Sequence, residues 1–216
     1  MPSDNLELKA VDLACERNDL ALFNHLSFSV APGQLLKITG HNGSGKTSLL
    51  RILCGLRMPD EGSVQWCGHC IRKNRIEFLT DMAYVGHQHG IKNDLTASEN
   101  LRLTNLAGSR NQKFSIPDVL KRFNLEQHED VLARNLSAGQ KQRLALARLL
   151  LNNARLWILD EPFTAVDLHG RENFEHEMAA HLANGGMVVM SSHHPLSGTI
   201  NNVVSLELGR DNNATG

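Results

Sequence analysis

Alternating apolar and polar positions mark the first elements of the chain. The alternation over residues 6–13, and again over 26–30, predicts two strands that each bury one face. An Ala-Pro-Gly turn at 31–33 leads into a short apolar strand at 34–39. Beyond a second turn at 59–62, residues 63–67 and 82–85 show the strand pattern again. The amino-terminal part of the chain is therefore predicted to be rich in β-structure.

Helices alternate with strands along the rest of the chain. Residues 47–54 have an amphipathic helical pattern that ends at Gly55, directly after a glycine-rich turn. A long helix is predicted from Ser137 to about Leu151, and another from about His169 to Leu182. Apolar strands are predicted at 156–159, 187–191 and 203–208. This alternation predicts an α/β fold.

One region interrupts the alternation. Residues from about 89 to 136 have a helical pattern, and Thr96 and Glu99 form a predicted capping box ahead of Leu101. We therefore expect a single domain over 1–210, with a core at 1–88 and 137–210 and an inserted helical lobe at about 89–136. The polar residues 211–216 are expected to form a flexible tail.

Charge and hydropathy exclude several classes of protein. The formal net charge of −1 does not favour the broad basic surface by which nucleic-acid-binding proteins hold phosphate backbones. The first residues show neither the basic nor the apolar segment of a secretory signal. The most apolar helical stretch, 144–151, contains Arg148 and is much shorter than the roughly 20 residues that span a bilayer. We expect a cytosolic chain that reaches a membrane only through a partner.

The four cysteines do not indicate a disulfide framework, because they are few and scattered. Cys67 and Cys70 have the spacing of thiol-disulfide exchange centres, but they follow a short strand in a predicted turn rather than beginning a helix. No second pair of metal-ligand spacing follows them. We expect reduced cysteines with neither a redox nor a metal role.

The glycine-rich turn after the strand at 34–39 has the composition of a phosphate-binding loop. Its glycines allow successive backbone N–H groups to converge on phosphate oxygens at a helix N-terminus, where the helix dipole favours negative charge. A plain turn would not explain the Lys-Thr pair, which is spaced to reach the β- and γ-phosphates and to ligate Mg²⁺. The sequence therefore predicts a site for ATP or GTP with Mg²⁺, formed by Gly40, His41, Asn42, Gly43, Ser44, Gly45, Lys46 and Thr47.

Two carboxylates follow the apolar strand at 156–159. In sheets of this kind, ligands bind at the carboxyl ends of the strands, so Asp160 and Glu161 are predicted to lie beside the phosphate-binding loop. Asp160 is expected to hold Mg²⁺, and Glu161 to polarise the attacking water. The alternative is that both acids are solvated residues at a helix start, and it loses force beside a phosphate-binding loop.

A third segment narrows the class of nucleotide-binding protein. Residues 136–140, Leu-Ser-Ala-Gly-Gln, resemble the L-S-G-G-Q signature of ABC ATPases with one Ala in place of Gly. Considered alone, Ser137 and Gln140 could be a capping box at an ordinary helix start. The other motifs favour the family: Gln88 follows a strand like its Q-loop, residues 165–167 resemble its D-loop, and His193 follows a buried strand like its switch histidine.

The resemblance covers nearly the whole chain and implies a P-loop NTPase of the ABC ATPase type, with an antiparallel β subdomain besides the helical lobe. It implies a head-to-tail dimer in which ATP lies between the loop at 40–47 of one copy and the signature segment of the other. Catalytic roles are implied for Glu161, His193 and Gln88, with His194 the less favoured histidine. The implied Mg²⁺ ligands are Thr47, Gln88 and Asp160, and the implied ATP contacts of the second copy are Ser137, Ala138, Gly139 and Gln140.

This chain departs from the family at the position that holds the base. ABC domains usually stack adenine on an aromatic residue of the first hairpin, and the matching position here is Arg17. A guanidinium plane can also stack on a base. The departure therefore puts base selectivity in question, but not hydrolysis.

Several stretches are similar to the family of ATP-binding export subunits of the cytochrome c maturation system, among them 86–92, 95–101, 156–165 and 192–196. This similarity implies a peripheral subunit on the cytoplasmic face of the bacterial inner membrane. The implied partners are a CcmB-like integral membrane subunit and other cytochrome c maturation components. The implied activity is ATP hydrolysis that drives haem export or the release of a haem-loaded chaperone. We expect no direct binding of haem or nucleic acid by this chain.

Three other functions compete with that interpretation. The ATPase could serve a transporter for another substrate, such as a lipoprotein or an ion. A soluble ABC ATPase that acts on ribosomes or DNA would generally have tandem domains or a long coiled-coil insertion, and the sequence shows neither. A small P-loop kinase would need an acceptor lid and would not need the segment Ser137–Gln140.

Overall fold

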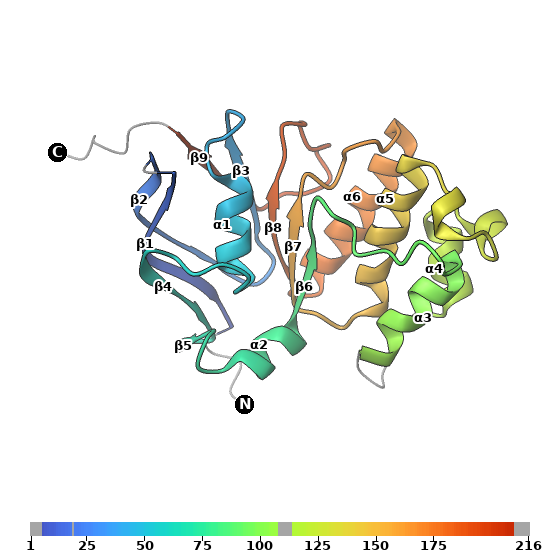
Figure 1. The fold of residues 1–216 in the computed structure, drawn as a ribbon, viewed down its shortest axis with the longest axis horizontal. Helices are drawn as coiled ribbons and strands as arrows, with labels where there is room; N and C mark the ends of the chain where they lie inside the picture. The colour runs from blue at the N-terminus through green and yellow to red at the C-terminus, as the bar shows by residue number, and fades with distance from the viewer. Residues whose placement is uncertain (1–5, 19, 108–113, 210–216) are drawn as a thin grey trace.

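The computed structural model describes residues 6–18, 20–107 and 114–209, so the expected tail at 211–216 lies outside the described residues. Within them the chain forms two sheets with helices between and beside them (Figure 1). The first sheet has the order β2-β1-β4-β5, and the second has the order β6-β7-β8-β3-β9. The α/β fold predicted from the alternation of strands and helices is confirmed.

The first sheet is antiparallel and is built from β1 (Leu8–Arg17), β2 (Leu20–Val30), β4 (Glu61–Trp66) and β5 (His69–Cys70). Its first two strands are longer than their alternation predicted. Bulges interrupt the β1–β2 register between Ala10 and Glu16, where Asp12 has a φ of 50°. Because each bulge adds an unpaired residue, the alternation of apolar and polar positions changes phase and hides part of the strand.

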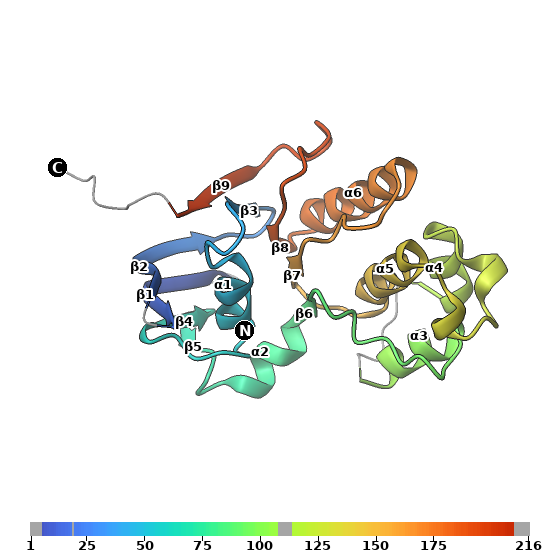
Figure 2. The ribbon, with the colours of Figure 1, turned by 45° about the horizontal axis from the view of Figure 1, so that its top comes forward.

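The second sheet is parallel and contains β3 (Leu35–Gly40), β6 (Met82–Val85), β7 (Leu156–Asp160), β8 (Met187–Ser191) and β9 (Val203–Leu208). Both of its faces are covered, so β7 and β8 are buried at every position. Leu156 and Ile158 join a core shared with α1 (Lys46–Leu53) and the antiparallel sheet. Trp157 and Leu159 join a second core, which includes α5 (Ala138–Ala147) and α6 (Leu168–Ala183). Figure 2 shows these helices on opposite sides of the sheet.

The helical region contains α3 (Ala97–Ala107), α4 (Ile116–Arg122) and short 3₁₀ turns at Glu126–His128 and Ala133–Asn135. The capping box predicted at its start is present: Glu99 N–H donates to Thr96 Oγ1 at 3.2 Å, and Thr96 N–H donates to Glu99 Oε2 at 2.8 Å. Helices α3 and α4 also contact α5, with which they share a core. The boundary of the lobe at residue 136 stays a prediction, because α5 packs against both parts.

Two helical elements also differ from the sequence expectations. Helix α2 (Arg75–Asp81) was not predicted, because it is short and buries only Phe78, leaving Ile76 and Leu79 exposed. The long helix expected to reach Leu151 ends as an α-helix at Ala147 and continues as a 3₁₀ turn over Arg148–Leu151, a common way to tighten a last turn. Among the described residues, none of the helices has the length and apolar character needed to cross a membrane.

Candidate nucleotide-binding site

The glycine-rich loop connects the carboxyl end of β3 to the first residue of α1. Gly45 is the N-cap of α1 and has a φ of 97°, a left-handed conformation that glycine adopts without strain. Gly40 has a φ of 142°, and a Cβ on it would lie 2.4 Å from the carbonyl oxygen of Leu208. Both positions therefore favour glycine for their backbone angles, and Gly40 also because β9 leaves no room for a Cβ there.

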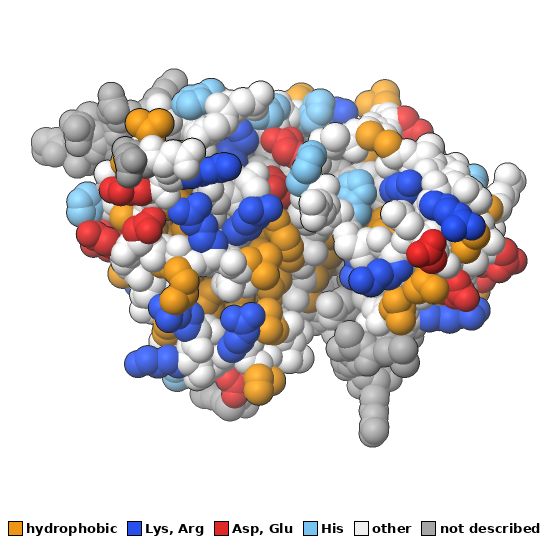
Figure 3. All heavy atoms as spheres, in the orientation of Figure 1, with side chains coloured by type: hydrophobic (Ala, Val, Ile, Leu, Met, Phe, Trp, Pro, Cys, Tyr) orange, Lys and Arg blue, Asp and Glu red, His pale blue; other side chains and the backbone are white. Residues whose placement is uncertain are grey.

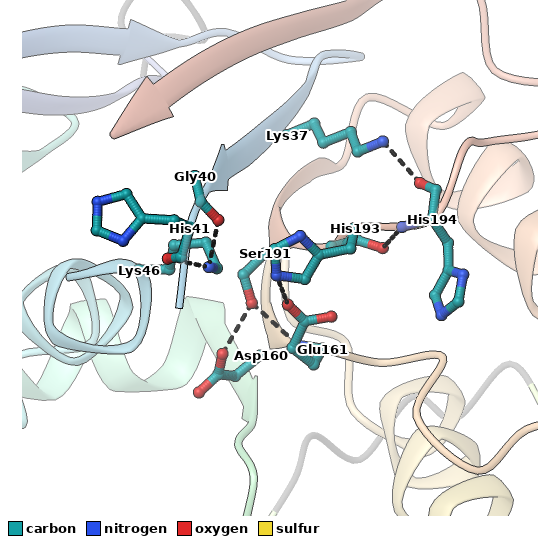
Figure 4. Close-up of polar contacts among 10 residues, drawn as sticks. Lys37, Gly40, His41, Lys46, Asp160, Glu161, Ser191, His193 and His194 are labelled. Carbon is teal, nitrogen blue, oxygen red and sulfur yellow. Dashed lines mark hydrogen bonds and ion pairs between the residues drawn. The ribbon is translucent and has the colours of Figure 1, made fainter. Parts of the chain in front are cut away.

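Lys46 lies inside the loop that precedes it. Its side chain is largely buried, and Nζ donates to the carbonyl oxygens of Gly40 at 2.7 Å and His41 at 3.0 Å (Figure 4). These bonds hold the ammonium group at the N-terminus of α1, where the helix dipole also favours anions. The arrangement is that of a cation placed to meet phosphate.

A pocket of about 530 Å³ opens in front of this loop. The first hairpin contributes Arg17 and Leu22, and the ends of β7 and β8 contribute acidic and imidazole side chains. Segments far apart in the sequence therefore build one cavity, which is large enough for a nucleotide. Its lining residues are Arg17, Leu22, Asn42, Gly43, Gly45, Lys46, Thr47, Ser48, Asp160, Glu161, Thr164, His193 and His194.

Asp160 is the last residue of β7 and is 5% exposed. Its Oδ1 accepts a hydrogen bond from Ser191 Oγ at 2.8 Å, while its buried Oδ2 has no hydrogen-bond partner among the described residues. Carboxylate and hydroxyl oxygens are hard ligands of the kind that Mg²⁺ prefers. The unpartnered oxygen of Asp160, with the exposed hydroxyl of Thr47 in the same pocket, therefore fits a Mg²⁺ ion.

Glu161 follows directly, in a left-handed backbone conformation with a φ of 50°. Its N–H donates to both the carbonyl oxygen of Ser191, at 3.2 Å, and Ser191 Oγ, at 3.0 Å. Its Oε1 lies 3.5 Å from His193 Nε2, and both side chains are partly exposed. A non-glycine residue in this conformation is held by its surroundings and often belongs to a functional site. The geometry brings the predicted water-polarising carboxylate and the predicted switch histidine together.

Gln88 does not line this pocket. It is exposed in the loop after β6, as predicted, but it borders a separate cavity of about 390 Å³ with Ile91 and Lys141. Its expected roles in catalysis and Mg²⁺ binding therefore stay predictions, because this structure does not bring Gln88 together with the residues of the nucleotide pocket. His194 does line the pocket, and its carbonyl oxygen accepts a hydrogen bond from Lys37 Nζ at 2.6 Å.

The signature segment is also outside the pocket, at the start of α5. The capping box inferred from the sequence is present: Gln140 N–H donates to Ser137 Oγ at 3.2 Å, and Ser137 N–H donates to Gln140 Oε1 at 2.8 Å. Ser137 and Ala138 are exposed. Gly139 packs closely on the segment after Glu161, since a Cβ there would lie 2.6 Å from the carbonyl oxygen of Ala165.

Sequence reasoning missed several residues that organise the site. Ser191 contacts both acidic residues, Lys37 holds the carbonyl group of His194, and Gln142 Nε2 donates to the carbonyl oxygen of Pro162 at 2.7 Å. One signal was available for Ser191, since it is a polar residue at the end of an otherwise apolar strand. Lys37 shows a similar signal, as a charged residue within the apolar strand β3, whereas the contact of Gln142 depends on the tertiary arrangement.

A phosphate-binding loop, an acidic pair at a strand end, a nearby histidine and an exposed signature helix together define an ABC-type ATPase. The ABC transporter family model matches residues 23–164, and the chain belongs to this family. Among individual relatives, the chain is 51% identical to the cytochrome c biogenesis ATP-binding export protein CcmA of Methylococcus capsulatus, over 88% of this chain and 92% of that protein. It is 48% identical to the protein of that name from Salmonella typhi, over 93% of this chain and 96% of the relative. The chain is thus a CcmA-like ABC ATPase.

Solved structures agree on the fold. The ATP-binding cassette MJ0796, solved as a dimer in a post-hydrolysis state bound to ADP and Pi, superimposes with a TM-score of 0.79 at 24% identity. The match covers 94% of this chain and 97% of that cassette. At this identity the likeness concerns the fold, and it confirms the expected ABC ATPase architecture.

Proposed function

We propose that this chain is the ATP-hydrolysing subunit of a transport complex in c-type cytochrome biogenesis, where it drives haem export or the release of a haem-loaded chaperone. The observation that carries the proposal is the single pocket containing Lys46, Asp160, Glu161 and His193, in a chain about half identical to export proteins of that pathway over most of its length. The two observations support different parts of the proposal. The pocket supports ATP hydrolysis, and the similarity to the export proteins supports the process that hydrolysis drives.

The residues of the pocket divide the work of phosphoryl transfer. Lys46 and the backbone of residues 40–47 bind the β- and γ-phosphates, and Arg17, which lines the same pocket, stacks on the base. Asp160 and Thr47 would hold Mg²⁺, which neutralises charge on the phosphates when bound. Glu161 orients the attacking water, and His193, 3.5 Å from it, fixes the position of the carboxylate. Little more is required, since catalysis of this transfer rests on positioning and electrostatics.

The functional unit in this proposal is a head-to-tail dimer of two copies. Ser137 and Ala138 are exposed and lie outside the pocket of their own chain, so they are free to meet the ATP of a second copy. The dimer of the similarly folded cassette MJ0796 makes such an assembly feasible for this fold. Each copy would then supply one phosphate-binding loop and one signature helix to two shared sites.

A membrane partner is proposed to dock near α2. Leu56 and Met58, after α1, and Ile76 and Leu79, on α2, are exposed apolar side chains. On the face shown in Figure 3, apolar side chains line the hollow beside the helical lobe, with Lys and Arg side chains at its edge. Such a surface fits the cytoplasmic segments of a CcmB-like integral subunit. The chain would then be peripheral on the cytoplasmic face of the inner membrane.

The experiment that tests this function is complementation of a deletion strain of the source bacterium. We expect the deletion to abolish holo c-type cytochromes, measured by haem staining, and expect the unaltered chain to restore them. Lys46→Ala should fail to restore them at equal expression, whereas the matched control Ala138→Gly should succeed. A deletion strain with normal holocytochromes would refute the proposed pathway. Restoration by Lys46→Ala would show that ATP hydrolysis at this site is not what the pathway uses.

A further inference from the structure

Ser191 lies where the functional residues of the two central strands meet. It is the last residue of β8, is 0% exposed, and pairs with Asp160 in the parallel β7–β8 register. Two residues further along the chain is His193, which lines the nucleotide pocket. Parallel pairing thus places one buried hydroxyl beside the metal-binding carboxylate and just ahead of the switch histidine.

The hydroxyl of Ser191 makes two hydrogen bonds of opposite sense (Figure 4). Its only proton is donated to Asp160 Oδ1 at 2.8 Å, while its oxygen accepts the N–H of Glu161 at 3.0 Å. A hydroxyl can do both at once, and an aliphatic side chain can do neither. The bond to Asp160 fixes one carboxylate oxygen and leaves the other, Oδ2, without a hydrogen-bond partner in the described parts of the chain.

The second bond bears on the backbone of Glu161. That residue has a φ of 50°, a conformation that a non-glycine residue adopts only where its surroundings hold it. Two acceptors on Ser191, its carbonyl oxygen at 3.2 Å and its Oγ, bind the Glu161 N–H. Ser191 therefore supports the conformation that aims the Glu161 side chain toward His193.

We propose that Ser191 is a positioning residue for ATP hydrolysis: its hydroxyl orients Asp160 toward Mg²⁺ and Glu161 toward the attacking water. The inference rests on the proposed function of this pocket. It predicts that loss of the hydroxyl weakens the binding of Mg²⁺ and slows the chemical step, while nucleotide binding through Lys46 and the loop at 40–47 is retained. Ser191 touches neither phosphate nor water in this account, so it acts through its two neighbours.

The matched variants are Ser191→Thr and Ser191→Val, because the two side chains have nearly the same shape and differ in the hydroxyl. We expect Ser191→Val to lower kcat about 10-fold or more relative to Ser191→Thr, as charge-assisted hydrogen bonds are among the stronger ones. We also expect the Mg²⁺ concentration for half-maximal activity to rise several-fold, and the Kd for ATP without Mg²⁺ to change less than about 2-fold. Steady-state ATPase assays over Mg²⁺ and ATP concentrations measure the first two, and a fluorescent ATP analogue measures the third.

Equal kcat and Mg²⁺ dependence in the Thr and Val variants would overturn the inference, because the hydroxyl would then have no role. Should the Val variant fail to fold, Ser191→Ala takes its place in the comparison, with melting temperature as the check on folding. Asp160→Asn and Lys46→Ala separate this result from the proposed function. If those two remain fully active, the site itself is wrong; if they are inactive while Thr and Val behave alike, only the role of Ser191 is refuted.

Discussion

The two helix starts assigned to ATP, at α1 and at α5, are completed in different ways. The N-cap of α1 is Gly45, which has no side chain to bond the free amides of the first turn. The N-cap of α5 is Ser137, whose capping box with Gln140 pairs the N–H groups of these two residues within the chain. The first start is walled by Asp160, Glu161 and residues of the first hairpin, whereas the second is exposed.

This difference separates a site that the chain builds alone from one that it can only offer to another molecule. The amides at α1 lie inside a pocket with a buried lysine, so an anion there is enclosed by its own chain. The start of α5 folds without help and presents Ser137 and Ala138 outward. In the proposed dimer these roles are complementary. The start of α5 is already folded and exposed in the single chain, so it can contact a second copy without a change in its own structure.

The largest effect is expected from the α1 side. Lys46→Ala should lower ATPase activity more than about 100-fold and weaken ATP binding, because a preorganised charge facing the phosphates is lost. The fold should survive, since the bonds of Lys46 to the rest of the described chain are those to the carbonyl oxygens of its own loop. Activity and ATP affinity, with far-UV circular dichroism as the folding control, measure this. Full ATPase activity in this variant would contradict the assignment of the loop at 40–47 to the ATP site.

A smaller effect is expected on the α5 side, where two neighbouring positions form a matched pair. Gly139→Ala should lower activity about 10-fold, because its Cβ would lie 2.6 Å from the carbonyl oxygen of Ala165 and must displace that segment. Ala138→Gly, which restores the usual family residue at an exposed position, should keep activity within about 2-fold and cost at most about 1 kcal/mol of stability. ATPase assays and urea unfolding of both variants test this contrast. Equal losses in the two would mean that the packing on Ala165 is unimportant.

The comparison also shows what sequence patterns reveal. The elements predicted most accurately were those with a single hydrophobic period or a short capping motif. They are the strands at 82–85, 187–191 and 203–208 and the capping boxes at Thr96 and Ser137. The strands β1 and β2 were predicted too short because bulges break their hydrophobic alternation. The helix α2 was missed because it is too short to show a helical period. In the site, motif residues were found by composition, whereas Ser191 and Lys37 act through contacts between segments far apart in the chain. The position of Gln88 outside the pocket was likewise beyond the reach of motif order.

The smallest effect on activity is expected far from both helix starts, at His181. This histidine is on α6 beside the amino end of β8, with its ring stacked 3.9 Å from that of Trp157 and Nε2 3.3 Å from the carbonyl oxygen of Met187. Burial lowers its pKa to about 4, below the roughly 6.5 of an unfolded chain. The unfolded state therefore binds more protons between these values, and the free energy of unfolding should fall by about 3 kcal/mol as pH drops from about 6.5 to 4.

His181→Phe should remove that part of the pH dependence while keeping the ring stack. Urea unfolding of both proteins between pH 4 and 7 gives the difference directly. ATPase activity of the variant at pH 7.5 should stay within about 2-fold, since His181 is not a lining residue of the nucleotide pocket. A difference in stability that is constant across the pH range would contradict the assigned cause. A large loss of ATPase activity would indicate that the amino end of β8, near His181, influences the nucleotide pocket.

The most direct measurement of the central claim is the mass of the protein in solution with ATP. Glu161→Gln removes the carboxylate proposed to polarise the attacking water but not the binding groups, so ATP should persist and hold two copies together. Light scattering should show a dimer with ATP and Mg²⁺ and a monomer without them. Adding Ser137→Arg to Glu161→Gln should keep ATP binding and lose the dimer, because the exposed start of α5 would be blocked. A protein that stays monomeric at saturating ATP, or a dimer unaffected by Ser137→Arg, would contradict the claim that the two helix starts meet across copies.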